Sequence, residues 1–276
     1  MALRVLLPIL TYPDPTPVAP LARAADFAAT LRAQLTAIVH EVDVPPIENP
    51  VADLLLDFKA QSLAAERQSR HKGEEIARHL QQSCERIGRP LAVETLRIER
   101  PCGEFVAASA RGYDLTMLIC EPDSPDHALL QQDVLFGSGG PVVIFPTVDA
   151  SSHLATVCIA WDGSRAASRA MRDAIPLLKQ SGSVRLLTCS QDKPISPKSI
   201  DGVLALLSAH EIDARHVPVQ LQGTGIGLAL QNAALAQDAG LLVMGAYGHS
   251  RMREFIMGGA TASVLRSPML PLFMSH

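Results

Sequence analysis

The feature of this sequence that most constrains its fold is an internal repeat. An apolar strand pattern at residues 4–10 is followed by a turn and an Ala-rich amphipathic segment, and the same order begins again at residue 155, about 150 residues later. Each copy also ends on a short apolar strand pattern, at residues 141–146 and 271–274. A chain of 276 residues is long enough to form two such domains, each with its own core.

Strand and helix patterns alternate in the same order in both copies. In the first copy, strands are expected at 35–42, 91–98 and 115–120, and helices at 21–33, 51–87 and 103–110. In the second copy, strands are expected at 184–189, 214–221 and 241–244, and helices at 165–179, 200–209 and 225–237. Short apolar strands that alternate with helices are typical of parallel sheets covered on both faces. The sequence therefore predicts an α/β fold of two tandem doubly wound, Rossmann-like domains, each with a five-stranded parallel sheet.

The repeat also predicts the domain limits and the seam between the copies. The first domain is expected at 1–148 and the second at 154–276, joined by a linker near 147–154. Two copies in one chain are expected to form an intramolecular pseudo-dimer, and a homodimer of whole chains is a further expectation. The closing strands are the expected seam, because edge strands need cover.

Within the long helical segment at 51–87, a core face is expected from Leu54, Leu55, Phe58 and Leu63, which lie at helical spacing. Gly73 stands inside the charged stretch that follows, so a division into two helices is expected there.

The charge and hydropathy of the chain exclude several classes of partner. Its 24 Lys and Arg residues against 28 Asp and Glu residues give a net charge of −4. The chain therefore lacks the excess of positive charge that attracts nucleic acid or an anionic membrane. No apolar run approaches the roughly 20 residues that span a bilayer, and the first residues lack the basic region and cleavage site of a leader. A cytoplasmic protein with neither nucleic acid nor membrane as a partner is therefore expected.

The five cysteines are far apart and contain no Cys-x-x-Cys pair, so neither a zinc site nor redox chemistry is predicted. Buried thiols that act as small apolar side chains are expected at Cys84, Cys102, Cys120, Cys158 and Cys189.

The segment richest in chemistry follows the fourth strand pattern of the second copy. An apolar run ends at Gly245, Gly248 follows, and nine residues later Gly258 and Gly259 precede a helix expected from Ala260. Glycines let backbone N–H groups approach an anion, and a helix start adds unpaired donors and a favourable dipole. Since ligands of α/β sheets bind beyond the carboxyl ends of the strands, this segment fits a polyphosphate.

The spacing Gly-x2-Gly-x9-Gly, together with Asp162-Gly163-Ser164 at the end of the first strand of this copy, resembles the universal stress protein family in its ATP-binding branch. The two copies resemble the tandem members of that family, and the resemblance covers essentially the whole chain. It implies a site in the second domain for ATP or a similar adenine nucleotide, with or without Mg²⁺.

The resemblance also implies which residues contact the nucleotide. On the adenine side these are Ala160, Trp161 and Asp162. The residues implied along the ribose and phosphates are Met244, Gly245, Gly248, Gly258, Gly259 and Ala260. Tyr247 occupies a loop position that often holds a polar ring or a hydroxyl group.

One position departs from the family pattern, which usually has Ser or Thr directly after the third glycine. Here that position is Gly259, and Thr261 comes two residues later. The loss of one neutral hydrogen bond costs about 0.5 to 1.5 kcal/mol, or about 2- to 13-fold in affinity. Two interpretations of Arg251 and Arg253 stay open: charge-assisted hydrogen bonds to phosphate, which would offset this loss, or exposed cations on a helix face.

The first copy lacks the acidic turn and the glycine-rich segment that characterise the second. Its first strand pattern runs into Thr11-Tyr12-Pro13, without an acidic residue directly after the strand. After its fourth strand pattern, residues 120–126 bring carboxylates and two prolines to the place where a phosphate needs bare backbone donors. A degenerate site is therefore predicted in the first domain.

Two segments imitate other motifs. Residues 223–227 are similar to a dinucleotide fingerprint, but their third glycine comes one place early and no acidic residue stands about 20 positions further on. They are interpreted as a helix start. Residues 138–140 are similar to the pyrophosphatase loop of adenylating enzymes, but they precede a closing strand and do not follow the first one.

The sequence contains no Gly-x4-Gly-Lys-Ser/Thr, Gly-x-Ser-x-Gly or His-Glu-x-x-His motif, so no catalytic residue and no metal site is predicted. The resemblance implies a stress-response protein that signals or protects by binding a nucleotide, with slow ATP hydrolysis left open. Two alternatives also stay open: an adenylating or dinucleotide-dependent enzyme of a related α/β fold, and an interaction protein without a ligand.

Overall fold

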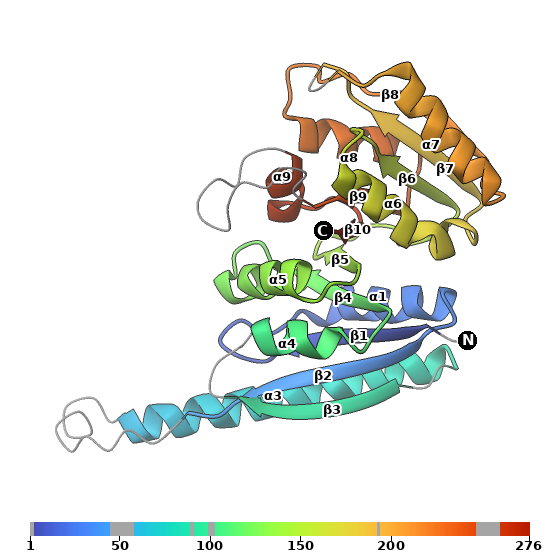
Figure 1. The fold of residues 1–276 in the computed structure, drawn as a ribbon. Helices are drawn as coiled ribbons and strands as arrows, with labels where there is room; N and C mark the ends of the chain where they lie inside the picture. Colours follow the sequence, from blue (N-terminus) through green and yellow to red (C-terminus); the bar gives the residue numbers. More distant parts are fainter. Residues whose placement is uncertain (1–2, 45–57, 89–90, 99–102, 192–193, 247–259) are drawn as a thin grey trace. The chain divides into compact units, whose positions relative to one another are not determined.

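The computed structural model of the chain describes residues 3–44, 58–88, 91–98, 103–191, 194–246 and 260–276 (Figure 1). Contacts between residues divide the chain into two compact units, Met1–Val134 and Leu135–His276. Strands and helices alternate along the chain in both units.

The first unit is a parallel sheet in the order β3-β2-β1-β4, with helices between successive strands. Leu6, Leu7 and Ile9 of the central strand are fully buried, because both faces of β1 are covered. Its strands are β1 (Arg4–Leu10), β2 (Gln34–Val42), β3 (Leu91–Ile98) and β4 (Leu115–Cys120). Its helices are α1 (Val18–Thr30), α3 (Phe58–Arg86), α4 (Gly103–Ala110) and α5 (Pro125–Gly137), of which α5 ends just beyond the division.

Helix α3 corrects two expectations. It runs through Gly73 without a break. A Cβ atom there would lie 3.0 Å from Cγ1 of Val39, so glycine lets the helix approach β2 closely. Its buried face begins further along than expected: Leu63 is 44% exposed, whereas Ile76 and Leu80 are buried. Leu54, Leu55 and the side chain of Phe58 lie outside the described part of the chain.

The second unit holds six strands in the order β5-β10-β9-β6-β7-β8. All neighbouring pairs are parallel except β10 and β5. The strands are β5 (Val142–Pro146), β6 (Thr156–Ala160), β7 (Ser183–Thr188), β8 (Ala214–Pro218), β9 (Leu241–Gly245) and β10 (Leu272–Ser275). The helices are α6 (Arg165–Leu178), α7 (Pro197–Ala209), α8 (Ile226–Ala236) and α9 (Ala260–Arg266).

The predicted fold class is confirmed: each copy of the repeat contributes five strands that alternate with helices, β1–β5 and β6–β10. The closing strands β5 and β10 pair with each other, with Ile144 opposite Leu272 and Val142 opposite Met274. Because its partner is β10, the closing strand of the first copy groups with the second unit. The domain limits 1–148 and 154–276 follow the repeat and stay a prediction.

The described cysteines Cys84, Cys120, Cys158 and Cys189 are buried thiols, as expected, and Cys102 lies outside the described residues. Burial raises the pKa of the Cys120 thiol to about 11 and that of Cys158 to about 12, which suits packing and not nucleophilic chemistry. Within the described ranges, none of the helices is both long and apolar enough to cross a membrane.

Candidate functional site

The candidate site lies where the strand order of the second copy reverses. Strand β6 has β9 on one side and β7 on the other, and Ile159 of β6 pairs with Val243 of β9. The next residues, Ala160 and Met244, therefore lie at adjoining carboxyl ends, and both are buried. Ligands of doubly wound sheets bind beyond the strand ends at such a reversal.

The turn after β6 is held by hydrogen bonds within the chain. The backbone N–H of Trp161 donates to the carbonyl oxygen of Leu187 at 2.8 Å, which ties the turn to β7. The backbone N–H of Ser164 donates to Oδ1 of Asp162 at 2.8 Å, and Gly163 between them has a φ of +75°. A side chain at Gly163 would strain this backbone, so glycine is favoured at the turn. The Asp162 carboxylate is therefore oriented at the end of β6.

The same turn begins helix α6. Ser164 is its N-cap residue, and its Oγ accepts a hydrogen bond from the backbone N–H of Ala167 at 3.1 Å. Asp162-Gly163-Ser164 thus forms both a turn and a helix cap, which is compatible with a ligand contact. A carboxylate oxygen carries more than one acceptor direction, so a bond from Ser164 does not exhaust Asp162.

At the end of β9, Gly245 packs directly against the first turn of α6. A Cβ atom at this position would lie 2.5 Å from the backbone nitrogen of Ala167, closer than real Cβ contacts allow. The following residue, Ala246, extends the strand pairing, since its N–H donates to the carbonyl oxygen of Ser275 at 2.9 Å. Gly245 thus brings the end of β9 beside the start of α6, and packing requires it whether or not a ligand is present.

The structure brings together five of the predicted site residues at the ends of β6 and β9: Ala160, Trp161, Asp162, Met244 and Gly245. Ala260 and Thr261 form the start of α9, as expected, and Thr261 is buried. The predicted residues that lie outside the described part of the chain are Tyr247, Gly248, Arg251, Arg253, Gly258 and Gly259. The phosphate-binding role of that loop stays a prediction.

Ser199 belongs to this region, although no sequence motif indicates it. The indole Nε1–H of Trp161 donates to Oγ of Ser199 on helix α7 at 3.2 Å. The helix starts at Pro197, with Ser196 as its N-cap residue, and a Ser-Pro pair of this kind is a recognisable start signal. The contact itself joins residues 38 apart in sequence, so no local pattern indicates it.

The glycines at 223–227 have structural roles of their own. Gly223 has a φ of +77° and Gly225 is the N-cap residue of α8. A Cβ atom at Gly227 would lie 2.9 Å from the carbonyl oxygen of Ala260, because α8 and α9 pack closely there. The interpretation of this segment as a helix start is confirmed.

The corresponding strand ends of the first copy are occupied by side chains of the chain itself. Oγ1 of Thr16 accepts a hydrogen bond from the N–H of Leu10 at 2.9 Å, at the end of β1. The ring of His127, on α5, lies 3.4 Å from the carbonyl oxygen of Ile119 and 3.2 Å from that of Asp14. His127 is buried, so it bridges the end of β4 and the loop after β1. This arrangement supports the interpretation of a degenerate first site.

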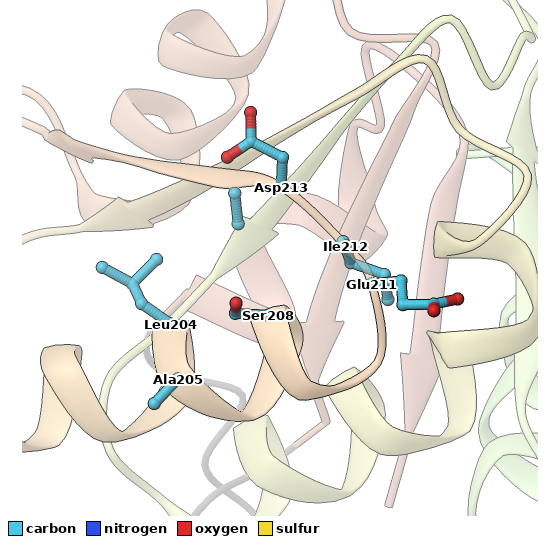
Figure 2. A pocket seen from close by; sticks show the side chains of 7 residues that line it. Leu204, Ala205, Ser208, Glu211, Ile212 and Asp213 are labelled. Atoms are coloured by element: carbon cyan, nitrogen blue, oxygen red, sulfur yellow. The ribbon is translucent and has the colours of Figure 1, made fainter.

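A pocket of about 500 Å³ lies at the other end of α7, where the chain turns into β8 (Figure 2). Its lining residues are Leu204, Ala205, Ser208, Glu211, Ile212, Asp213 and Ala214. In Figure 2 the carboxylates of Glu211 and Asp213 point in different directions, so they do not converge on one ligand atom. Across the described ranges, no group of three or more His, Cys, Asp and Glu side chains is placed to hold a metal ion.

No protein-family model matches the sequence, and no curated protein matches it significantly. Among solved structures, a universal stress protein from Archaeoglobus fulgidus matches with a TM-score of 0.70 at 17% identity, over 99% of this chain and 96% of that one. A putative universal stress protein from Pseudomonas aeruginosa matches with a TM-score of 0.57 at 13% identity, over 99% of this chain and 93% of that one. A functionally unknown protein from the same species matches with a TM-score of 0.57 at 14% identity, over 99% and 92%. Over essentially its full length, the chain therefore has the fold of the universal stress proteins.

Proposed function

We propose that this chain is a tandem universal stress protein that binds ATP or a similar adenine nucleotide in its second copy. It acts in a stress response by holding the nucleotide, and the chemistry of a turnover enzyme is not part of its role. The observation that carries the proposal is the meeting of the Asp162 turn and Gly245 at the adjoining ends of β6 and β9. This is the position at which doubly wound folds hold nucleotides.

The proposed contacts divide between the two strand ends. The turn after β6 recognises the adenine side through Ala160, Trp161 and the oriented Asp162 carboxylate. The segment after β9 holds the phosphates through the backbone donors of Gly248, Gly258 and Gly259, with charge from Arg251. When Mg²⁺ is bound, it neutralises phosphate charge.

In this proposal the first copy serves as a scaffold. Its strand ends are bridged by His127, and Glu121, Asp123 and Asp126 follow β4. Carboxylates repel phosphate, so no second nucleotide is expected there. One nucleotide per chain, in a cytoplasmic protein, is the expected state.

Mass spectrometry of small molecules released from the purified protein tests this function. The expected result is an adenine nucleotide in near-equimolar amount. Trp161 is the sole tryptophan of the chain, so its fluorescence offers a second readout during titration with ATP. Absence of a released nucleotide, together with unchanged fluorescence and no heat of binding at millimolar ATP, would overturn the proposal in favour of an interaction protein. Turnover of a second substrate would favour the enzyme alternative.

A further inference from the structure

Trp161 is fixed at both its backbone and its side chain. Its backbone N–H is bound to Leu187 of β7 at 2.8 Å, and its indole N–H is bound to Oγ of Ser199 on α7 at 3.2 Å. Ser199 also borders the turn itself, since a Cβ atom at Gly163 would lie 3.5 Å from its Oγ. Helix α7 therefore contacts the turn after β6 through Trp161 and runs close to Gly163.

The residue directly after Trp161 is Asp162, whose carboxylate is tied to Ser164 at the start of α6. The turn is thus anchored to three different elements: β7 through Leu187, α7 through Ser199, and α6 through Ser164. The α7 anchor is the only one of these three made by a pair of side chains, so it can be removed without altering a backbone hydrogen bond.

From this arrangement we infer that Ser199 is a positioning residue for the adenine side of the site: it holds the Trp161 ring and, through it, the Asp162 turn in the binding geometry. This inference rests on the proposed function. Ser199 lies outside the motifs that define the site in the sequence, and its hydroxyl acts through Trp161 without touching the ligand.

The anchor also limits what Trp161 contributes. An indole has a single N–H donor and no acceptor, and Ser199 engages that donor. The side chain of Trp161 therefore offers the nucleotide its ring and not a hydrogen bond. A ring held in one orientation costs less to order on binding than a free one, which favours affinity.

The test compares Ser199→Ala with Ser199→Thr and with Ser208→Ala in the full chain. Ser208 lies on the same helix, is exposed, and lines the pocket at the other end of α7. Removal of the Ser199 hydroxyl should lower the affinity for both adenosine and ATP by about 2- to 10-fold, because the anchor acts on the adenine side. Ser199→Thr should keep wild-type affinity, and Ser208→Ala should not change it. In the absence of ligand, only Ser199→Ala should lower the fluorescence anisotropy of Trp161.

Trp161→Phe removes the same hydrogen bond from its other end. In a double-mutant cycle measured by calorimetry, Ser199→Ala should add nothing to the loss caused by Trp161→Phe, because one bond is removed in both. Unchanged affinity of Ser199→Ala alongside a binding wild-type protein overturns the inference and leaves the proposed function standing. A wild-type protein that binds neither adenosine nor ATP overturns both. Additive losses in the cycle would also overturn the positioning role.

Discussion

The end of β9 touches the first turn of α6 backbone to backbone at Gly245, where a Cβ atom would lie 2.5 Å from the amide nitrogen of Ala167. This contact sets the distance between the two halves of the proposed site, because the Asp162 turn leads into α6 and the phosphate-binding segment follows β9. The sequence motif assigns Gly245 to phosphate binding alone. Its contact with α6 shows that it also serves packing.

Gly245→Ala should displace α6 from β9 and lower the free energy of unfolding by about 1 to 3 kcal/mol, as overpacked cores do. Urea denaturation of the full chain measures this change. Gly202→Ala is the matched control, since Gly202 lies inside α7 with open space around its Cα. That control should leave stability unchanged or raise it by up to about 1 kcal/mol. Equal effects of the two variants would contradict the packing role of Gly245.

Two substitutions separate the phosphate side of the site from the adenine side. Gly248→Val should lower the affinity for ATP more than that for adenosine, because a branched side chain obstructs the approach of phosphate to the backbone. Asp162→Ala should lower the affinity for both ligands alike. Binding constants for adenosine and ATP, determined by calorimetry, make the comparison.

Asp162→Asn refines that comparison, because the amide oxygen can still accept the hydrogen bond from Ser164. If Asp162→Asn binds like wild type, the carboxylate acts through the shape of the turn and not through its charge. Wild-type ATP affinity in a Gly248→Val protein that melts normally would exclude the phosphate-binding role of the loop.

His40 should make the stability of the first unit depend on pH. It is 3% exposed, its two ring nitrogens have no hydrogen-bond partner among the described residues, and burial lowers its pKa from 6.5 to about 4. The unfolded chain therefore binds more protons than the folded chain between these pH values, so the free energy of unfolding falls as the pH is lowered from 6.5 toward 4. The full loss amounts to about 3 kcal/mol.

Denaturation curves at a series of pH values measure this dependence. His40→Leu should flatten it in the range between pH 6.5 and 4, whereas His79→Gln, at an exposed position of α3, should retain the wild-type slope. An unchanged slope in His40→Leu would mean that other groups carry the acid sensitivity.

His127 is expected to matter for the first unit and not for nucleotide binding. Its replacement by Ala leaves the carbonyl oxygens of Ile119 and Asp14 without this partner and should cost about 1 to 3 kcal/mol of stability. The ATP affinity of the folded variant should equal that of wild type. A gain of a second nucleotide in this variant would show that His127 blocks a site that is otherwise intact.

The sequence predicts most of the fold because the repeat and the apolar strand patterns are local signals. Prediction from the sequence fails where contacts between residues far apart in the chain determine the local structure. Gly73 disfavours a helix by local preference, yet α3 runs through it, and the missing side chain lets the helix pack closely against Val39. Leu63 fits a core face by spacing, yet it is 44% exposed.

The same limit applies to the candidate site. Ala160, Asp162 and Gly245 follow from motif spacing and from the rule that ligands bind at strand ends. Ser199 and His127 do not, because each acts through a contact with a residue far away in sequence. Such contacts become visible only when the elements are packed.

Titration calorimetry of the full chain with ATP tests the central claim most directly. We expect one ATP per chain, with binding abolished or strongly weakened by Gly248→Val and left intact by His127→Ala. Two equivalent sites per chain, or no binding by a folded wild-type protein freed of endogenous ligand, would contradict it.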